Sequence, residues 1–231
     1  TSYYFRGAIS NNWVSFAGFY WRIIRVNGDG SVRMIYTGST APTESQAVVM
    51  TGAGTYIGNS KFNPSENWYM NGSTNSTIKT YIDNWYSTNL TSYVNKISDS
   101  VYCNDTYPST DPNTPNGIYS SIKTIYYGGY IRLFTYSTPI LKCYRISDAY
   151  TVSDTTNGNG KLTYPIALIT ADEISISGGV FKEENIYKPV NDFSHNYLYN
   201  NEYYYSLTPS YYSEPEEVTN IFSVTPPYLE T

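Results

Sequence analysis

Apolar and polar residues alternate through much of the first 36 residues, a pattern typical of half-buried strands. The alternation within residues 13–26 predicts two opposite faces, with Trp21, Ile23 and Arg25 on one and Tyr20, Arg22 and Ile24 on the other. Asn27–Gly30 (NGDG) predicts a hairpin turn, because Asn and Gly accept positive φ. Residues 31–36 are then the returning strand, and residues 3–7 form a shorter aromatic strand.

A helical period replaces this alternation in residues 76–97. Two sets of apolar residues follow the spacing i, i+3, i+4 and i+7: Ile78, Tyr81, Ile82 and Trp85, then Leu90, Tyr93, Val94 and Ile97. Ser76 or Thr74 can cap the N-terminus, and residues 87–90 interrupt the pattern. The spacing predicts two short helices, or one broken helix, covering a sheet.

Loops are predicted on both sides of this helical region. Residues 37–72 are rich in Gly, Ser, Thr and Asn, with one short element around Ala47–Met50. Residues 104–130 contain Pro108, Pro112 and Pro115 and are expected to form a long loop. Loops of this length are usually functional or held in place by a cross-link.

The second half of the chain has further strand-like segments. Strands are predicted at Tyr130–Tyr136, at the end of residues 155–170, and at 196–199, 202–210 and 219–226. Residues 171–179 predict a helical turn, which Thr170 would cap and in which Asp172 and Glu173 suit the positive N-terminus. Because no repeat or linker divides the chain, residues 1–231 are expected to form a single α+β domain with twisted, mainly antiparallel sheets, two short helices and long loops.

Composition limits the classes of partner. Charged residues are 14% of the chain, against about 25% in average proteins. The net charge of −5 argues against binding to nucleic acid or to anionic lipid. No run approaches the roughly 20 apolar residues that cross a bilayer. Membrane contact is therefore expected only through an anchor absent from this sequence.

Cys103 and Cys143 are the only cysteines, and His195 is the only histidine. In an exported protein the two cysteines predict a disulfide, the alternative being two buried thiols. One histidine and two distant cysteines do not form a zinc motif, and no nucleophile-elbow, metalloprotease or phosphate-loop motif occurs. We expect no catalytic activity and no cofactor. Carboxylates in Ser213–Val218 could bind Ca²⁺, although a solvated turn is the more common role.

Tyrosine is the anomaly, at 28 of 231 residues. It offers a large, fairly rigid face with a polar end, which suits binding surfaces. The predicted ligand-binding face lies near the C-terminus and comprises Asn196, Tyr197, Tyr199, Asn200, Asn201, Tyr203, Tyr205, Tyr211 and Tyr212. The alternative is that these tyrosines pack an edge strand.

Two functions follow from these features. The first is recognition or adhesion outside the cell, with a glycan or a protein on a host or neighbouring cell as the ligand. The second is self-association into a surface filament, in which strand-like termini pair with a neighbouring copy.

Three segments together resemble a domain of surface-anchored proteins from gut Firmicutes: residues 3–36 (YYFRG to VRMIY), ISDSVYCNDT with NGNGKLTYPIALITADEISISGG, and NYLYNNEYYYSLTPSYYS. More distantly, the layout is similar to the C-type-lectin-like fold of formylglycine-generating enzymes and retroelement variable proteins. The second resemblance implies a Tyr- and Asn-rich binding face near the C-terminus. The calcium-dependent sugar motif of true lectins is reduced to Glu214–Glu216, and the catalytic cysteine pair of the formylglycine enzymes is absent.

Overall fold

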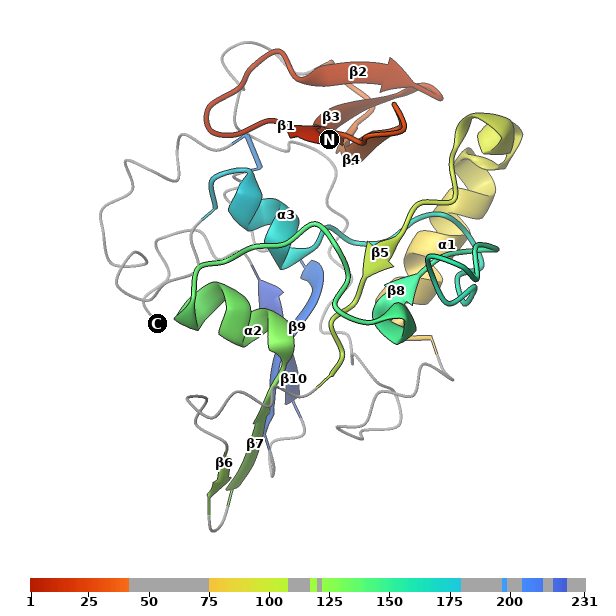
Figure 1. Cartoon of the computed structure of the whole chain (residues 1–231). Helices are drawn as coiled ribbons and strands as arrows, with labels where there is room; N and C mark the ends of the chain where they lie inside the picture. The colour runs from red at the N-terminus through yellow and green to blue at the C-terminus, as the bar shows by residue number, and fades with distance from the viewer. Residues whose placement is uncertain are drawn as a thin grey trace. The chain divides into compact units, whose positions relative to one another are not determined.

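The computed structural model describes residues 1–41, 75–107, 117–119, 122–179, 197–198, 205–213 and 218–223 (Figure 1). These residues form antiparallel sheets and short helices, which confirms the α+β class. The chain divides into two compact units. Unit 1 comprises residues 1–55, 172–204 and 224–231, and unit 2 comprises residues 56–171 and 205–223. The single domain over residues 1–231 stays a prediction.

Unit 1 contains a four-stranded antiparallel sheet centred on β3 (Figure 1). Its strands are β1 (Tyr3–Tyr4), β2 (Trp13–Phe16), β3 (Phe19–Val26) and β4 (Val32–Gly38). β4 pairs along the length of β3, whereas β2 pairs with the first residues of β3 and β1 with its last two. The predicted hairpin of residues 19–36 is confirmed.

Two tight turns connect these strands. Between β2 and β3, Ala17 and Gly18 both have positive φ, at 56° and 81°, as two-residue hairpin turns require. Between β3 and β4, the Asn27 amide donates to the Ser31 carbonyl at 2.8 Å. Gly30 has φ +85° there, which a side chain would rarely adopt.

A β-bulge changes the predicted faces of β3. The register passes from Ile23↔Met34 to Arg25↔Arg33, so Ile24 has no partner residue on β4. The extra residue redirects the side chains that follow it. As a result Arg25 and Arg33 both reach Glu173, and the prediction that Arg25 shares a face with Ile23 is wrong.

Helix α3 (Ala171–Ile176) confirms the predicted helical turn. The Arg6 guanidinium donates to the carbonyls of Ser175 and Ile176, so it satisfies acceptors that a helix C-terminus leaves unpaired. The Gly7 amide donates to the Ser177 carbonyl, and the Tyr197 amide donates to the Gly7 carbonyl. The core of unit 1 therefore joins segments far apart in sequence, and its most buried apolar residues are Trp21, Ile24, Ile174, Tyr197 and Leu198.

Unit 2 opens with α1 (Thr77–Asn89) and the 3-10 helix η2 (Thr91–Lys96), which confirms two short helices. The Ser76 hydroxyl accepts from the Lys79 amide at 3.2 Å, as predicted for an N-cap. The buried stripe is rotated from the predicted one: it runs through Asp83, Tyr86 and Leu90, while Tyr81 is 40% exposed. Apolar spacing identified the helices but not the face that they bury.

The main sheet of unit 2 has the order β10-β9-β7-β6, with every pair antiparallel (Figure 1). Its strands are β6 (Gly117–Tyr119), β7 (Ile122–Tyr126), β9 (Tyr205–Ser213) and β10 (Val218–Ser223). β9 and β10 confirm the last two predicted strands. β6 and β7 lie within residues 104–130, so the expectation of a loop throughout that stretch is wrong.

The predicted strand at Tyr130–Tyr136 is also wrong. Helix α2 (Gly128–Tyr130) continues there into a π-helical turn, η3 (Ile131–Thr135). Packing against β9 explains the difference, because a Cβ on Gly129 would lie 2.4 Å from Cγ2 of Thr208. Glycine allows this close approach, and tertiary packing overrides the strand propensity of the residues that follow.

Two further strand predictions have different outcomes. Residues 161–170 are irregular instead of a strand, and the Leu207 amide of β9 donates to the Ile169 carbonyl at 2.7 Å. Of the strand predicted at 196–199, only Tyr197 and Leu198 are described, in a turn. The element predicted at Ala47–Met50 lies outside the described residues.

Candidate functional site

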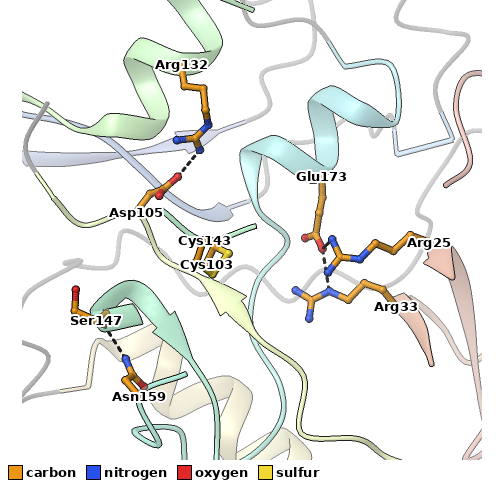
Figure 2. Close-up of a disulfide and its surroundings, with 9 residues drawn as sticks. All are labelled: Arg25, Arg33, Cys103, Asp105, Arg132, Cys143, Ser147, Asn159 and Glu173. Carbon is orange, nitrogen blue, oxygen red and sulfur yellow. Dashed lines mark hydrogen bonds and ion pairs between the residues drawn. A yellow bond between two sulfur atoms is a disulfide. The ribbon is translucent and has the colours of Figure 1, made fainter. Parts of the chain in front are cut away.

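The disulfide predicted between Cys103 and Cys143 is confirmed (Figure 2). Cys103 ends β5 (Tyr102–Cys103), which pairs antiparallel with β8 (Ala149–Tyr150). The short helix η4 (Ile146–Asp148) leads into β8. Residues 144–148 are therefore fixed at both ends. The disulfide joins Cys143, just before them, to β5, and β8, just after them, pairs with the same strand.

Two tyrosine rings stack beside this disulfide. Tyr107 lies four residues after Cys103 and Tyr144 directly follows Cys143. Their ring centroids are 4.7 Å apart with an interplanar angle of 19°. The guanidinium carbon of Arg145 lies 4.6 Å from the centroid of the Tyr107 ring, a cation–π distance.

Part of this cluster faces solvent. Tyr144 is 64% exposed and Ile146 is 59% exposed, and Arg145 between them is also exposed. Tyr107 is half-buried beneath. We call the four residues Tyr107, Tyr144, Arg145 and Ile146 the aromatic platform.

The Tyr107 ring is held from below by α2. The Gly128 amide donates to the Tyr107 carbonyl at 3.2 Å, and a Cβ on Gly128 would lie 2.2 Å from Cζ and Oη of the ring. Only glycine leaves room for the ring in this position. Burial, followed by the nearby charge of Asp105, raises the pKa of Tyr107 to about 12, so the phenol is neutral at physiological pH.

Buried polar contacts fix the chain just before Tyr107. Asp105 has φ +50°, an uncommon conformation for a residue with a side chain, and its carboxylate pairs with Arg132 of η3 (Figure 2). The Thr106 hydroxyl donates to the carboxylate of Asp148. Strained backbone conformations that the surrounding structure holds in place occur more often at functional sites than elsewhere.

The exposed end of the platform is supported by the loop of residues 151–160. The Asn159 side-chain amide donates to the Ser147 carbonyl at 2.9 Å (Figure 2). Asp99 in turn accepts hydrogen bonds from the amides of Val152, Ser153 and Asp154 at 2.7, 2.7 and 2.9 Å. The disulfide, α2 and this loop thus hold an exposed aromatic surface in one geometry.

A second polar cluster lies in unit 1 and is largely buried. Glu173 is 3% exposed, and its Oε1 lies 3.3 Å from Nη1 of Arg25 and 3.0 Å from Nε of Arg33 (Figure 2). The sequence predicted a capping role for Glu173, whereas its carboxylate pairs with two strands of the sheet. Since Glu173 and Arg33 are buried and the Arg25 side chain is only 12% exposed, we assign the cluster a structural role.

Tyr197 belongs to this largely buried cluster. It is 0% exposed, and burial, followed by the charge of Glu173, raises the pKa of its phenol. The side chain therefore occupies a core position and is not accessible to a ligand in this structure.

The other residues of the predicted C-terminal face are not brought together by described contacts. Tyr205, Tyr211 and Tyr212 lie on β9, where the backbone is described. Five residues of the predicted face lie outside the described residues: Asn196, Tyr199, Asn200, Asn201 and Tyr203. His195 and Glu214–Glu216 lie outside them as well. The role of the predicted face in binding stays a prediction.

Neither a metal site nor a membrane span is found in the part of the chain that the structure describes. No group of three or more His, Cys, Asp and Glu side chains there could hold a metal ion. No described helix is both long enough and apolar enough to cross a bilayer.

Sequence reasoning did not identify Tyr107, Tyr144 or Arg145, although a signal was present. A disulfide brings the residues next to its two cysteines into proximity, so Tyr144 and Tyr107 were candidates once the pairing was predicted. The stack itself depends on Gly128, whose contact with Tyr107 cannot be inferred from spacing.

Comparisons with protein-family models, curated proteins and solved structures return no match for this chain. The function is therefore inferred from the described side chains.

Proposed function

We propose that this chain is an extracellular recognition domain that binds a carbohydrate through the aromatic platform. The observation that carries the proposal is the surroundings of Tyr144, which is 64% exposed yet stacked on a second ring that is itself held by α2. A ring fixed in advance loses little conformational entropy when a ligand binds, so its contact surface is used efficiently.

The chemistry of the platform suits a sugar ring. An exposed tyrosine presents a flat apolar face to the C–H groups of a pyranose, while its hydroxyl and the Arg145 guanidinium can bond to sugar hydroxyls. Four side chains are far fewer than the roughly 20–30 residues that each partner contributes to a stable protein interface. The size of the described surface therefore favours one or two sugar residues over a folded protein.

Location outside the cell is part of the same proposal. Disulfides persist in oxidising compartments, and here the disulfide holds the very segment that carries Tyr144. A bacterial surface domain of C-type-lectin-like character is consistent with these features. The glycan would then lie on a host or neighbouring cell.

A glycan array probed with the full chain and two variants tests the proposal. Tyr144→Ala removes the exposed ring and should abolish the signal, while the loss of one ring contact lowers the melting temperature by only a few degrees. Tyr81→Ala removes an exposed tyrosine of α1 and serves as the matched control, with binding retained. Absence of any glycan signal, or equal loss in the two variants, would contradict the proposal.

A structural subunit of a surface filament is the second candidate. Among the described residues, β1 and β10 each pair with one strand only, and Tyr3 and Tyr4 of β1 are exposed. Such edges can accept a strand from another copy. Light scattering on the native protein separates the two functions, since spontaneous polymers would support assembly and a stable monomer would exclude it.

A further inference from the structure

Two cations flank the exposed ring of the platform. Lys142 and Arg145 lie on either side of Cys143 and Tyr144, and both are exposed. Neither forms a salt bridge within the described part of the chain. Exposed positive charge that no described carboxylate pairs with is notable in a chain of net charge −5 with few charged residues.

We infer that the platform selects a carbohydrate that carries a carboxylate, such as a uronic or sialic acid. The inference rests on the proposed function and deepens it by naming the ligand class. Stacking on Tyr144 would serve neutral and acidic sugars alike, whereas the two cations discriminate between them.

The geometry of Arg145 suits this role. A guanidinium that lies over an aromatic ring uses its face for the cation–π contact, and its N–H groups remain in the plane of the group. Those N–H groups match the two oxygens of a carboxylate and can form a bidentate pair. The ring of Tyr107 thus contacts both Arg145 and the exposed Tyr144, and it holds the guanidinium in place before a sugar binds.

Two described carboxylates of this part of unit 2, Asp105 and Asp148, already have other partners. Asp105 is buried and pairs with Arg132, and Asp148 is buried and accepts from Thr106. Both carboxylates already have partners inside unit 2. Within the described part of the chain, Lys142 and the N–H groups of Arg145 therefore have no carboxylate partner and can meet an anionic ligand at the surface.

Paired oligosaccharides that differ only in charge test the inference by calorimetry on the full chain. The pairs are sialyllactose with lactose, and oligogalacturonate with its methyl ester; a sulfated oligosaccharide is added to distinguish sulfate from carboxylate. We expect at least one carboxylated probe to bind about tenfold or more tightly than its neutral partner, with affinity that falls as salt rises.

Variants assign that preference to the platform. Arg145→Gln should remove most of the discrimination, and Arg145→Lys should restore part of it because it keeps the charge but loses the planar fork. Lys96→Gln removes one exposed cation from η2 and should leave affinity unchanged.

The outcomes separate the two proposals. Neutral probes that bind as tightly as their carboxylated partners, and lose binding in Tyr144→Ala, would overturn the inference and leave the proposed function standing. Tighter binding of the sulfated probe than of any carboxylated one would overturn the carboxylate assignment. Absence of binding to every probe would count against both.

Discussion

Tyr144 and Tyr197 carry the same side chain in opposite surroundings. Tyr197 is enclosed in unit 1 beside Glu173, whereas Tyr144 lies at the surface of unit 2 on a second ring. Tyr197 contributes buried area and an electrostatic contact, and Tyr144 contributes an exposed face. High tyrosine content therefore does not by itself locate a binding surface; the surroundings of each ring decide its role.

Ala17 is a residue whose replacement should stabilise the protein. It has φ 56° in a turn that favours Asn-Gly, and positive φ costs an alanine about 1 kcal/mol. Ala17→Asn should raise the melting temperature by about 2–4 °C, measured by circular dichroism. Ala17→Val, which tolerates positive φ less well, should lower it; a Val variant as stable as the Asn variant would contradict the assigned turn.

Glu173 should be among the most sensitive positions of unit 1. Glu173→Gln keeps the volume but removes the carboxylate charge that faces the guanidiniums of Arg25 and Arg33. The loss of one partner from a buried ion pair costs about 3–5 kcal/mol. Urea unfolding should show this decrease, and Arg25→Gln should cost less because the Arg33 pair remains. Equal, small effects of the two changes would count against a buried network.

At the scale of elements, the sequence pattern correctly predicted the helices and strands that depend on interactions between residues close in sequence. The β3–β4 hairpin follows from alternation and the NGDG turn, and α1 with η2 follows from apolar spacing and the Ser76 cap. The bulge at Ile24 and the helical conformation of residues 128–135 escaped prediction because both depend on contacts distant in sequence, with α3 and with β9.

The aromatic platform could likewise be predicted from the sequence only in part. Pairing of Cys103 with Cys143 followed from cysteine number and the expectation of export. The ring stack did not, because it requires α2, and a strand had been predicted across most of the residues that continue that helix. Contacts between glycine and a ring leave no periodic signal in sequence.

Asp99 tests how strongly the loop of residues 151–160 is held. Asp99→Asn replaces one acceptor oxygen with an NH2 group, so either the Val152 amide or the amides of Ser153 and Asp154 lose their acceptor, which should cost about 1 kcal/mol given partial exposure. Asp154→Asn, at an exposed carboxylate, is the control and should have a smaller effect. Chemical denaturation of the two variants at neutral pH provides the comparison.

Asp99 should also make the stability of the protein depend on pH. Burial acts to raise the pKa of Asp99, but the hydrogen bonds from residues 152–154 outweigh it, and the pKa is lowered from 3.8. Its contribution is therefore fully present above about pH 4 and is lost as the pH falls through the lower folded value. The stability difference between the protein and Asp99→Asn should shrink below about pH 4; a constant difference would contradict this assignment.

At the scale of the whole molecule, tyrosine makes folding sensitive to alkali. Burial is the largest cause that raises the pKa values of Tyr86, Tyr107, Tyr150 and Tyr197, to about 12 for Tyr107. Above about pH 10 the unfolded chain releases phenolic protons that the folded chain retains. Stability should therefore be complete below that pH and decrease as the pH rises further.

Melting temperatures at increasing alkaline pH, with ultraviolet absorbance to follow tyrosinate, check this expectation. Tyr107→Phe should show a shallower decrease than the unchanged chain, because it lacks one of the shifted phenols. A melting temperature that stays constant from about pH 9 to pH 11 would mean that the buried tyrosines titrate normally.

The central claim is that an exposed, pre-positioned Tyr144 binds a carbohydrate. Its most direct test is the ratio of dissociation constants for the unchanged chain and Tyr144→Ala, by calorimetry with the strongest oligosaccharide from the array. We predict at least a tenfold weaker affinity, equivalent to about 1.4 kcal/mol, with a melting temperature lowered by only a few degrees. A ratio near one would contradict the account.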